Sequence, residues 1–546
     1  MDTNAFTKEK LDEMPKDVLV TLYLQLTEQY SVILKQNEEL LHKVDNLQEQ
    51  LLILVQNRFG RKSEKNLAIP GQLTLADEYA DVFNEAEVLA DTGNPSEPLI
   101  EEVVVRRKSR SKGVRESNLE HLETQVIEHS LDEETLKKHF PHGWHELADE
   151  VHKDLVIIPM RLQVNEHHVK IYAGNRDEEG ILRAPAPKRL LDHSILTPEL
   201  GAFIINTKYV NAVPLNRLSE EFLRGDAKIA RQDMAGWMIR LYQYYLLPIR
   251  QMMKETMLRG HHIHCDETPF VMPGKAKQYM WLYHSPADEN TPSIFLYEYP
   301  GTRGSAAPRE FLKGYSGYAV TDGYQVYHIL ARESAGELKV AGCWAHARRR
   351  FAEIVKVAGK AGPQTIGQKV AAEAVERIAA IYHVDDMNEG ESAKDRLEHR
   401  KRVVKPLVDA YFAWVKEKAA APGLDPSSKL AAALNYSVNQ EEFLRTFLTD
   451  GRLPLDNNDA ERSIRAFCVG KKNWHIIDSK SGAEASAFLY SLAETAKANN
   501  LKTYPYFAYL LHQLKEYPRG NVPRDVLEAL MPWSDKLPDI CRKNLE

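Results

Sequence analysis

The chain has 546 residues, of which 43% are hydrophobic and 27% charged, and its formal net charge is −7. This composition excludes a disordered chain and argues against wholesale coating of nucleic acid, while the length predicts about three or four folded units. No apolar run reaches the roughly 18 residues of a membrane helix, the start MDTNAFTKEK is polar, and the cysteines are scattered. We therefore expect a cytoplasmic protein without a disulfide framework.

A heptad pattern of apolar residues runs through the N-terminal segment. Gln, Glu and Lys lie outside this seam, so the pattern predicts a leucine-zipper-like coiled coil over 15–65 that forms a homodimer or a larger oligomer. One long amphipathic helix packed on its own domain is the alternative. The seam comprises Leu19, Tyr23, Leu26, Tyr30, Ile33, Asn37, Leu40, Val44, Leu47, Leu51 and Leu54, with Asn37 as its polar core position.

Residues 66–118 predict a linker with a basic arm. An acidic, turn-rich stretch containing DTGNPSEP precedes RRKSRSKGVR at 106–115, which contains no acid. The arm either contacts DNA phosphates or is a solvated charge run. In the first case the contacting residues include Arg106, Arg107, Lys108 and Arg110.

Residues 119–182 predict a small β-rich module, because stretches such as HHVKIYAG alternate in hydrophobicity. His139, His142 and His145 precede these strands at regular spacing. Three histidines can bind zinc, but no second pair of Cys or His ligands follows. We therefore interpret them as surface histidines and expect no structural zinc.

From 190 to 258 the pattern is helical. A helix ends near Leu223, a turn follows at 224–226, and a second helix begins soon after it. This arrangement is typical of a helix-turn-helix, in which the second helix contacts DNA with its first residues. Lys228, Arg231 and Gln232 would then bind DNA, although any helical hairpin gives a similar pattern.

The period changes to that of strands after Gly260. Three strand-like stretches, HIHCDETPF, QYMWLYHS and SIFLYEYP, precede a short helix near 309–313. A fourth strand lies in GYAVTDGYQVY, and a fifth runs into the basic helix of LKVAGCWAHARRRF. This order is that of the ribonuclease H-like fold, an α/β fold with a mixed five-stranded sheet and helices. It places Asp266 and Asp322 on neighbouring strands, where they could share a metal ion.

A third carboxylate is expected on a helix within LPLDNNDAERSIRAF. Asp456 or Asn457 can cap this helix, and Glu461 then lies on the same face as Arg465. Carboxylates are the ligands that Mg²⁺ or Mn²⁺ takes, and two such ions about 3.5–4 Å apart support phosphoryl transfer. The alternatives for the three acids are a strand-end residue, a turn former and a surface acid paired with arginine.

Basic residues follow both the fifth strand and the third acid. They are expected to face DNA phosphate near the acids, and a tryptophan among them to stack on a base. Basic helix faces are often only solvated, and that alternative stays open. The residues are His346, Arg348 and Arg349 after the fifth strand and Arg465, Lys471, Lys472 and Trp474 after the third acid.

Together these motifs resemble the transposases of the insertion-sequence-66 family, which are bacterial DDE transposases. The resemblance rests on FGRKSEK, HCDET, TDGYQVY, GCWAHARRRF, LPLDNNDAERSIR, CVGKKNW and SGAEASAFLYSLAETAK, which span most of the chain in the family's order. It implies that Asp266, Asp322 and Glu461 are the catalytic, metal-binding triad. The separation of 139 residues between the last two then corresponds to the family's helical insertion, at about 352–451.

The resemblance also implies a catalytic domain at 259–470 and a C-terminal helical domain at 471–546. The module at 119–182 would be the family's zinc-finger-like module, here without its usual cysteines. Because these cysteines are missing, zinc is not expected. The expected cofactor is Mg²⁺ or Mn²⁺, with two ions in each active site.

The expected function is DNA transposition, in which the enzyme cleaves insertion-sequence ends and transfers the strands to target DNA. The partners would be both DNAs, a second copy of the chain and accessory proteins of the same element, in the bacterial cytoplasm at the nucleoid. Two alternatives stay open, a ribonuclease H-like structure-specific nuclease and a catalytically inactive DNA-binding regulator. The intact acidic triad argues against the regulator.

Overall fold

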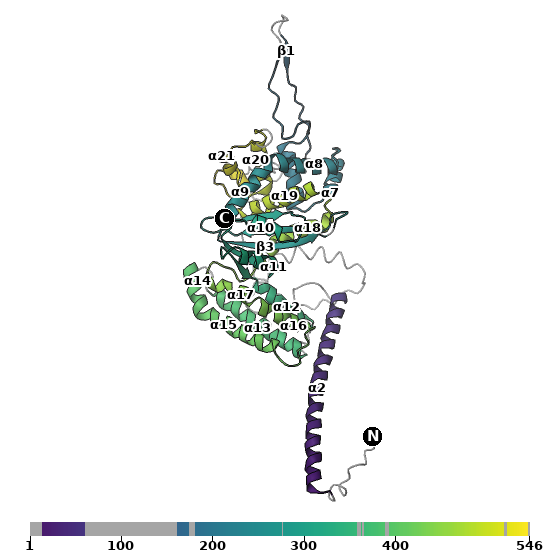
Figure 1. The fold of residues 1–546 in the computed structure, drawn as a ribbon. Helices are drawn as coiled ribbons and strands as arrows, with labels where there is room; N and C mark the ends of the chain where they lie inside the picture. The colour runs from purple at the N-terminus through teal and green to yellow at the C-terminus, as the bar shows by residue number, and fades with distance from the viewer. Residues whose placement is uncertain are drawn as a thin grey trace, which may run out of the picture.

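The computed structural model describes residues 14–59, 161–173, 181–275, 277–357, 362, 365–387, 392–517 and 521–543. Within this part of the chain a five-stranded sheet lies at the centre, with helices on both sides of it (Figure 1). None of the described helices is both long and apolar enough to cross a membrane.

The N-terminal heptad pattern lies on one helix, α2, which runs from Lys16 to Phe59 and has its N-terminal end farther from the sheet (Figure 1). Its 44 residues correspond to a length of about 66 Å at 1.5 Å per residue. Tyr23, Leu26 and Tyr30 of the seam are between 63% and 69% exposed. The predicted helix is confirmed, and its pairing with a second copy stays a prediction.

Only the end of the expected β-rich module belongs to the described residues. β1 (Ile171–Ala173) and β2 (Ile181–Arg183) form an antiparallel pair, and residues 161–170 have no regular secondary structure. The predicted linker, its basic arm and the three histidines of HFPHGWHEL lie outside the described residues.

The central sheet has the strand order β5-β4-β3-β6-β7. β3 pairs antiparallel with β4 and parallel with β6, while β4 pairs antiparallel with β5 and β6 parallel with β7. The predicted mixed five-stranded sheet is confirmed, and β3 and β4 have the predicted bounds. The strands are β3 (His262–Phe270), β4 (Gln278–Ser285), β5 (Ile294–Glu298), β6 (Gly317–Thr321) and β7 (Leu338–Gly342).

The outer edge of β5 is covered by α19 (Lys480–Ala498). Thr495 accepts a hydrogen bond from the backbone N–H of Phe295 at 2.9 Å. Ser491 accepts one from the backbone N–H of Tyr297 at 2.8 Å. Uncovered, these donors would be free to pair with another chain. The contact ends the sheet on this side and joins the C-terminal segment to it.

One hydrophobic cluster joins the sheet to helices that precede and follow it in the sequence. It contains Trp237 before the strands, Trp281 on β4 and Phe488 on α19. The predicted domain boundaries at 258 and 470 therefore do not divide the core, and α18 (Asn458–Trp474) crosses the second of them. The other helices of this part are α6 (Pro198–Ile205), η2 (Asn206–Val210), α7 (Leu215–Arg224), α8 (Arg231–Leu241), η3 (Tyr242–Leu246), α9 (Leu247–Met257), α10 (Ala306–Phe311), α11 (Gln325–Glu333), α20 (Thr503–Leu514), α21 (Arg524–Leu530) and η8 (Asp539–Cys541).

Between β7 and α18 the chain forms a helical unit with its own hydrophobic cluster, which lies below the sheet in Figure 1. Trp344, Tyr411 and Leu434 are buried in this cluster. The unit lies where the helical insertion was predicted, at about 352–451, and begins before it, at Trp344. Its helices are α12 (Trp344–Lys356), α13 (Ile366–Asp386), α14 (Ala393–His399), η5 (Arg400–Val404), α15 (Lys405–Ala419), α16 (Lys429–Asn439), α17 (Glu441–Leu444) and η6 (Thr446–Thr449).

A buried ion pair fixes the end of this unit that leads to α18. The side chains of Arg400 and Asp385 are both 0% exposed, and the guanidinium donates to the two carboxylate oxygens at 2.6 and 2.8 Å. It also donates to the backbone carbonyls of Phe447 and Asp450 at 2.9 Å each. Burial raises the pKa of Asp385, but its hydrogen bond and ion pair with Arg400 lower that pKa overall. Arg400 thus holds the segment through which the chain returns to the sheet.

We expect Asp385→Ala to lower the free energy of unfolding by about 3–5 kcal/mol, because it leaves the Arg400 charge buried without its partner. Urea-induced unfolding would measure the loss. The matched control is Glu373→Ala, which removes the acid of an exposed ion pair with Arg377 and should cost less than about 1 kcal/mol. Equal losses in the two variants would contradict a special role for the buried pair.

Candidate active site

Asp266 and Asp322 come to the same end of two neighbouring parallel strands. β3 pairs with β6 so that His264 lies opposite Val320, a difference of 56 in residue number. Asp266 and Asp322 differ by the same 56, and Asp322 directly follows the last residue of β6. The register, continued by two residues, therefore sets the two acids beside each other.

The turn after Asp322 requires a glycine. Gly323 has a φ of +91°, and a Cβ there would meet the Tyr436 hydroxyl and Gln440 Oε1 at 3.0 Å each. Tyr436 also donates a hydrogen bond to the backbone carbonyl of Asp322 at 2.7 Å. The helical unit thus holds the loop that carries this acid.

Asn457 fixes the beginning of α18 against β3. Its buried amide accepts a hydrogen bond from His264 Nδ1 at 2.8 Å and donates one to the backbone carbonyl of Cys265 at 2.9 Å. Both partners lie within two residues of Asp266 in the chain. The helix that carries Glu461 is therefore tied to the strand that carries Asp266.

The sequence left open whether Asp456 or Asn457 caps this helix. Asn457 occupies the N-cap position, but its side chain makes no capping bond. Asp456 Oδ1 instead accepts a hydrogen bond from the backbone N–H of Asn458 at 3.1 Å, and its Oδ2 accepts one from the Tyr382 hydroxyl at 3.2 Å. Because Asp456 satisfies the helix end, the Asn457 amide is available to bind β3.

Glu461 lies in the first turn of α18, and its side chain is only 17% exposed. Arg349 on α12 donates to its Oε2 at 2.7 Å, and His346 Nδ1 lies 3.4 Å from its Oε1. Neither Oε1 nor His346 Nδ1 makes a hydrogen bond. Glu461 is therefore not the surface acid paired with Arg465 that was the alternative interpretation. Two atoms of the kinds that bind metal ions face each other instead.

Four carboxylates gather at this end of the sheet. Burial raises the pKa of Asp266 well above its usual value, and the charges of Glu267, Asp322 and Glu461 raise it further. Burial and the charge of Asp322 raise the pKa of Glu267 to about 7, in spite of its 2.6 Å ion pair with Arg303. A bound cation would relieve repulsion of this kind.

These residues fit a divalent cation. Mg²⁺ and Mn²⁺ prefer oxygen ligands, which the acids supply together with an excess of negative charge and a carboxylate oxygen that has no hydrogen-bond partner. Among the described residues, Cys343, His346 and Glu461 offer ligand atoms within 4.8 Å of one another. Asp266, Asp322 and Glu461 do not form so tight a set, so they would have to move closer together around an ion.

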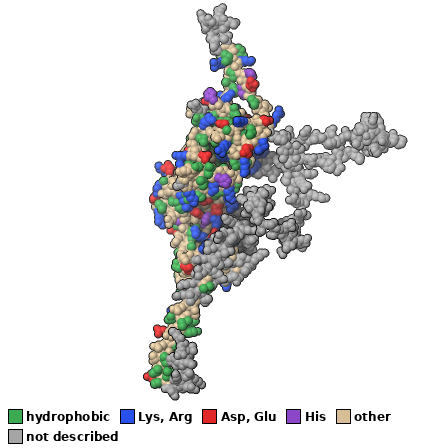
Figure 2. Space-filling model, turned by 90° about the vertical axis from the view of Figure 1, so that its right-hand side faces the viewer, with side chains coloured by type: hydrophobic (Ala, Val, Ile, Leu, Met, Phe, Trp, Pro, Cys, Tyr) green, Lys and Arg blue, Asp and Glu red, His purple; other side chains and the backbone are tan. Residues whose placement is uncertain are grey.

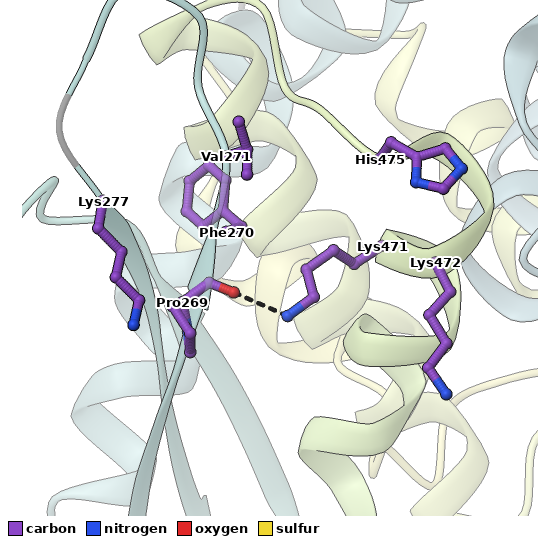
Figure 3. A pocket seen from close by; sticks show the side chains of 7 residues that line it. All are labelled: Pro269, Phe270, Val271, Lys277, Lys471, Lys472 and His475. Carbon is purple, nitrogen blue, oxygen red and sulfur yellow. Dashed lines mark hydrogen bonds between the residues drawn. The ribbon is translucent and has the colours of Figure 1, made fainter. Parts of the chain in front are cut away.

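Lysines line a cavity of about 580 Å³ beside the C-terminal end of β3 (Figure 3). Lys471 donates a hydrogen bond to the backbone carbonyl of Pro269 at 2.7 Å, while Lys277 and Lys472 extend from the two sides (Figure 3). Pro269 and Phe270 form part of the apolar wall. The cavity thus brings the predicted DNA contacts Lys471 and Lys472 together with a third lysine that the sequence analysis missed.

The predicted pair of helices with a turn between them is observed as α7 and α8. Lys228, Arg231 and Gln232 are exposed at and just before the start of α8. Figure 2 views the molecule from the side of these helices and shows Lys and Arg side chains interspersed with acids. Contact between these three residues and DNA stays a prediction.

The remaining predicted DNA contacts have different surroundings. Arg465 is exposed on α18, whereas Arg348 is half-buried on α12. Trp474 is half-buried, with its ring centroid 5.5 Å from that of Phe467, so its packing does not favour the predicted stacking on a base. The basic arm at 106–115 lies outside the described residues.

Glu267 and Arg303 belong to the site but were not predicted. Glu267 directly follows Asp266, and successive residues of a strand point to opposite faces of the sheet. Glu267 was therefore not expected to share a site with Asp266. The HCDET motif, in which two acids are adjacent, was the available signal. Arg303 lies in the loop after β5, and no pattern in the sequence marked it.

Known families and relatives match parts of this chain. A family model described as "Transposase IS66 family" matches residues 193–485, which is more than half of the chain. A second, described as "Transposase C of IS166 homeodomain", matches residues 46–127. The uncharacterized protein y4qI of Sinorhizobium fredii (strain NBRC 101917 / NGR234) is 29% identical over 70% of this chain and 70% of its own length. The uncharacterized protein y4jD of the same strain is 28% identical over 72% and 76%. No solved structure matches the chain.

The first matched region contains the whole sheet together with Asp266, Asp322 and Glu461. A mixed sheet with helices, a cluster of acids and this match define a DNA transposase, a nucleotidyl-transfer enzyme that acts on DNA. The chain belongs to the IS66 family of transposases.

In metal-free buffer we expect Asp266→Asn to match the stability of the natural chain near about pH 4 and to exceed it near about pH 8. Folding raises the pKa of Asp266, so the stability that this group contributes is present below its usual pKa and is lost as the pH rises. Thermal unfolding across this range would measure the difference. Added Mg²⁺ should reverse the order at the higher pH, because only the natural chain keeps all its ligands.

The control for this experiment is Asp226→Asn, which changes an exposed turn residue and should follow the natural chain at every pH. If Asp266→Asn were the less stable protein at high pH without metal, charge repulsion in the acidic cluster would be contradicted.

Proposed function

We propose that this transposase is a DDE enzyme with a ribonuclease H-like core, in which Asp266, Asp322 and Glu461 hold two Mg²⁺ or Mn²⁺ ions. It would cleave DNA at the ends of its insertion sequence and transfer the exposed 3′-hydroxyl to target DNA. The observation that carries the proposal is the parallel pairing of β3 with β6, whose register, continued by two residues, brings Asp266 opposite Asp322.

The strand arrangement supports the ribonuclease H-like assignment. β3, β4 and β5 follow one another as antiparallel neighbours, and β6 and β7 are then added in parallel on the other side of β3. β3, the first strand of this sheet in the sequence, is therefore its central strand. An acid on this strand is held by hydrogen-bonded strands on both sides. A second acid can lie next to it at the end of the neighbouring strand.

The residues of the chain would supply position and charge. When bound, two divalent ions activate the attacking oxygen and neutralise the leaving one. Asp266 and Asp322 form one side of the site and Glu461 the other, and Asn457 keeps the two sides in register. Catalysis of this kind needs no covalent enzyme intermediate, because it rests on positioning and electrostatic stabilisation.

Arg349 has a second role in this proposal. Its guanidinium binds Glu461 Oε2, while 37% of its side chain is exposed. With Glu461 holding an ion, Arg349 would bind a DNA phosphate, which offers the same kind of oxygen acceptor. The arginine would thus exchange a carboxylate for the substrate.

The remaining parts would assemble the protein on DNA. The seam of α2, which is exposed at Tyr23, Leu26 and Tyr30, would pair with the same helix of a second copy as a coiled coil, so that one assembly holds two element ends. Residues at the start of α8 would bind DNA, as the first residues of a recognition helix do. Accessory proteins of the same element would complete the assembly, in the bacterial cytoplasm at the nucleoid.

We expect the purified protein, with Mg²⁺, to cleave DNA that carries the ends flanking its own gene and to join those ends to target DNA. Asp266→Ala and Glu461→Ala should each lower the rate by at least about 10²–10³-fold, because each removes a metal ligand and a preorganised charge. Labelled DNA resolved on denaturing gels would measure both steps. Glu373→Gln, on an exposed face of α13, is the matched control and should leave the rate unchanged.

Each other outcome favours a different function. Cleavage without joining would favour a structure-specific nuclease. DNA binding without cleavage in Mg²⁺ or Mn²⁺, also after the neighbouring gene products are added, would favour a regulator. Full activity of Asp266→Ala would refute the proposed triad.

We expect the lysine-lined cavity to hold DNA phosphates. Changing Lys277 and Lys472 together to alanine should flatten the slope of log Kd against log salt by about 1.8, since each neutralised phosphate contributes about 0.9. Fluorescence anisotropy of labelled DNA in a salt series would measure the slope. The control changes Lys394 and Lys429, exposed on the helical unit, and an equal effect of both double variants would rule out a specific role for the cavity.

A further inference from the structure

A second set of side chains of the kinds that bind metal ions lies beside the proposed catalytic acids. His264, His284 and Asp459 offer ligand atoms that all lie within 4.8 Å of one another. His264 on β3 pairs directly with His284 on β4, and the two residues are 1% and 4% exposed. Asp459 comes from the first turn of α18. His264 also anchors Asn457, but none of the three is among the proposed catalytic metal ligands.

One ring nitrogen of each histidine is engaged by a hydrogen-bond contact, and the other ring nitrogen of His284 has no partner. His264 Nδ1 donates to Asn457 Oδ1 at 2.8 Å, which leaves its Nε2 with the lone pair. His284 Nε2 lies 3.3 Å from Ser293 Oγ, and its Nδ1 is buried without any hydrogen-bond partner. Metal-binding histidines have this arrangement, with one nitrogen for the metal and the other held by a hydrogen bond.

Asp459 is the negatively charged member of the three residues, and it faces solvent. Its side chain is 46% exposed, and Arg462 donates to its Oδ1 at 2.7 Å. An ion pair that is nearly half exposed contributes little, and the carboxylate keeps its second oxygen. Asp459 therefore marks the route by which an ion reaches the two buried rings.

We propose that His264, His284 and Asp459 bind a transition-metal ion of the zinc class. Two imidazole nitrogens and one carboxylate oxygen, with water in the fourth position, suit zinc, whereas Mg²⁺ prefers an all-oxygen set. The ion would clamp β3 and β4 to α18, two residues from Asp266 and two from Glu461. It would position the catalytic acids without touching the substrate. The sequence-based expectation of no zinc rested on other histidines, which lie outside the described residues.

The test measures metal binding by the full chain. After stripping with a chelator, loading with Zn²⁺ and desalting, the natural chain should retain a single zinc ion, as determined by atomic emission. His284→Gln and Asp459→Asn should each weaken binding by more than about 100-fold, since losing even the hydrogen-bond partner of a ligand costs about 10–100-fold. Zn²⁺ should also raise the Tm of the natural chain but not that of Asp459→Asn. The side chain of Asp459 is 46% exposed, so this substitution leaves the core intact.

Two kinds of control separate this site from its neighbours. His262→Gln changes the next histidine on the same face of β3, with its ring centroid 5.3 Å from that of His264, and should keep the zinc. Asp266→Asn and Glu461→Gln remove proposed catalytic ligands and should also keep it, so a failed catalytic proposal would not affect this result. The proposal is overturned if the natural chain retains no zinc after loading, or if both His284→Gln and Asp459→Asn bind it as tightly as the natural chain.

Discussion

The buried amide of Asn457 joins two parts of the molecule that lie 193 residues apart in the sequence. Its hydrogen bonds to His264 and Cys265 are shielded from water, so leaving either partner unsatisfied would cost about 1–3 kcal/mol. A helical unit with its own core can stand between β7 and α18 only if the chain returns to a fixed point on the sheet. Arg400 holds the segment before that point, and Asn457 holds the point itself. The position of Glu461 depends on both.

The acidic cluster is held together against its own repulsion. Arg303 binds Glu267 and Arg349 binds Glu461, while Asp266 stays on the central strand with its pKa raised by burial and by neighbouring charges. The repulsion between these carboxylates lowers the stability of the fold. The arrangement persists because the packing of the surrounding sheet and helices outweighs that repulsion. Sites that bind cations commonly have this property, since the ligand supplies the missing charge and stabilises the folded chain by mass action.

The sequence predicted the local features of this structure and missed those that depend on long-range pairing. Hydrophobic period located β3 and β4 to the residue, because it follows from short stretches of chain. Asp266 was placed beside Asp322 because the order of the predicted elements matched a known fold. The continuous core was not predicted, since contacts such as that of Tyr242 with Phe488, at 5.9 Å between ring centroids, join segments far apart in the sequence. The pairing of His264 with His284 needs the strand register, which the alternation of each strand does not fix. Trp474 was assigned to DNA by its residue type, and only the packing shows its contact with Phe467.

The separation of 139 residues between Asp322 and Glu461 also sets an order in time during synthesis. A ribosome adds about 5–20 residues per second, so the third acid is made roughly 7–28 s after the second. Until then the growing chain has the strands and two acids, but neither α18 nor the amide that anchors it. If the three acids act together as proposed, a chain that stops within the helical unit cannot cut DNA. Incomplete translation products of this gene would then be harmless to the chromosome of the cell that makes them.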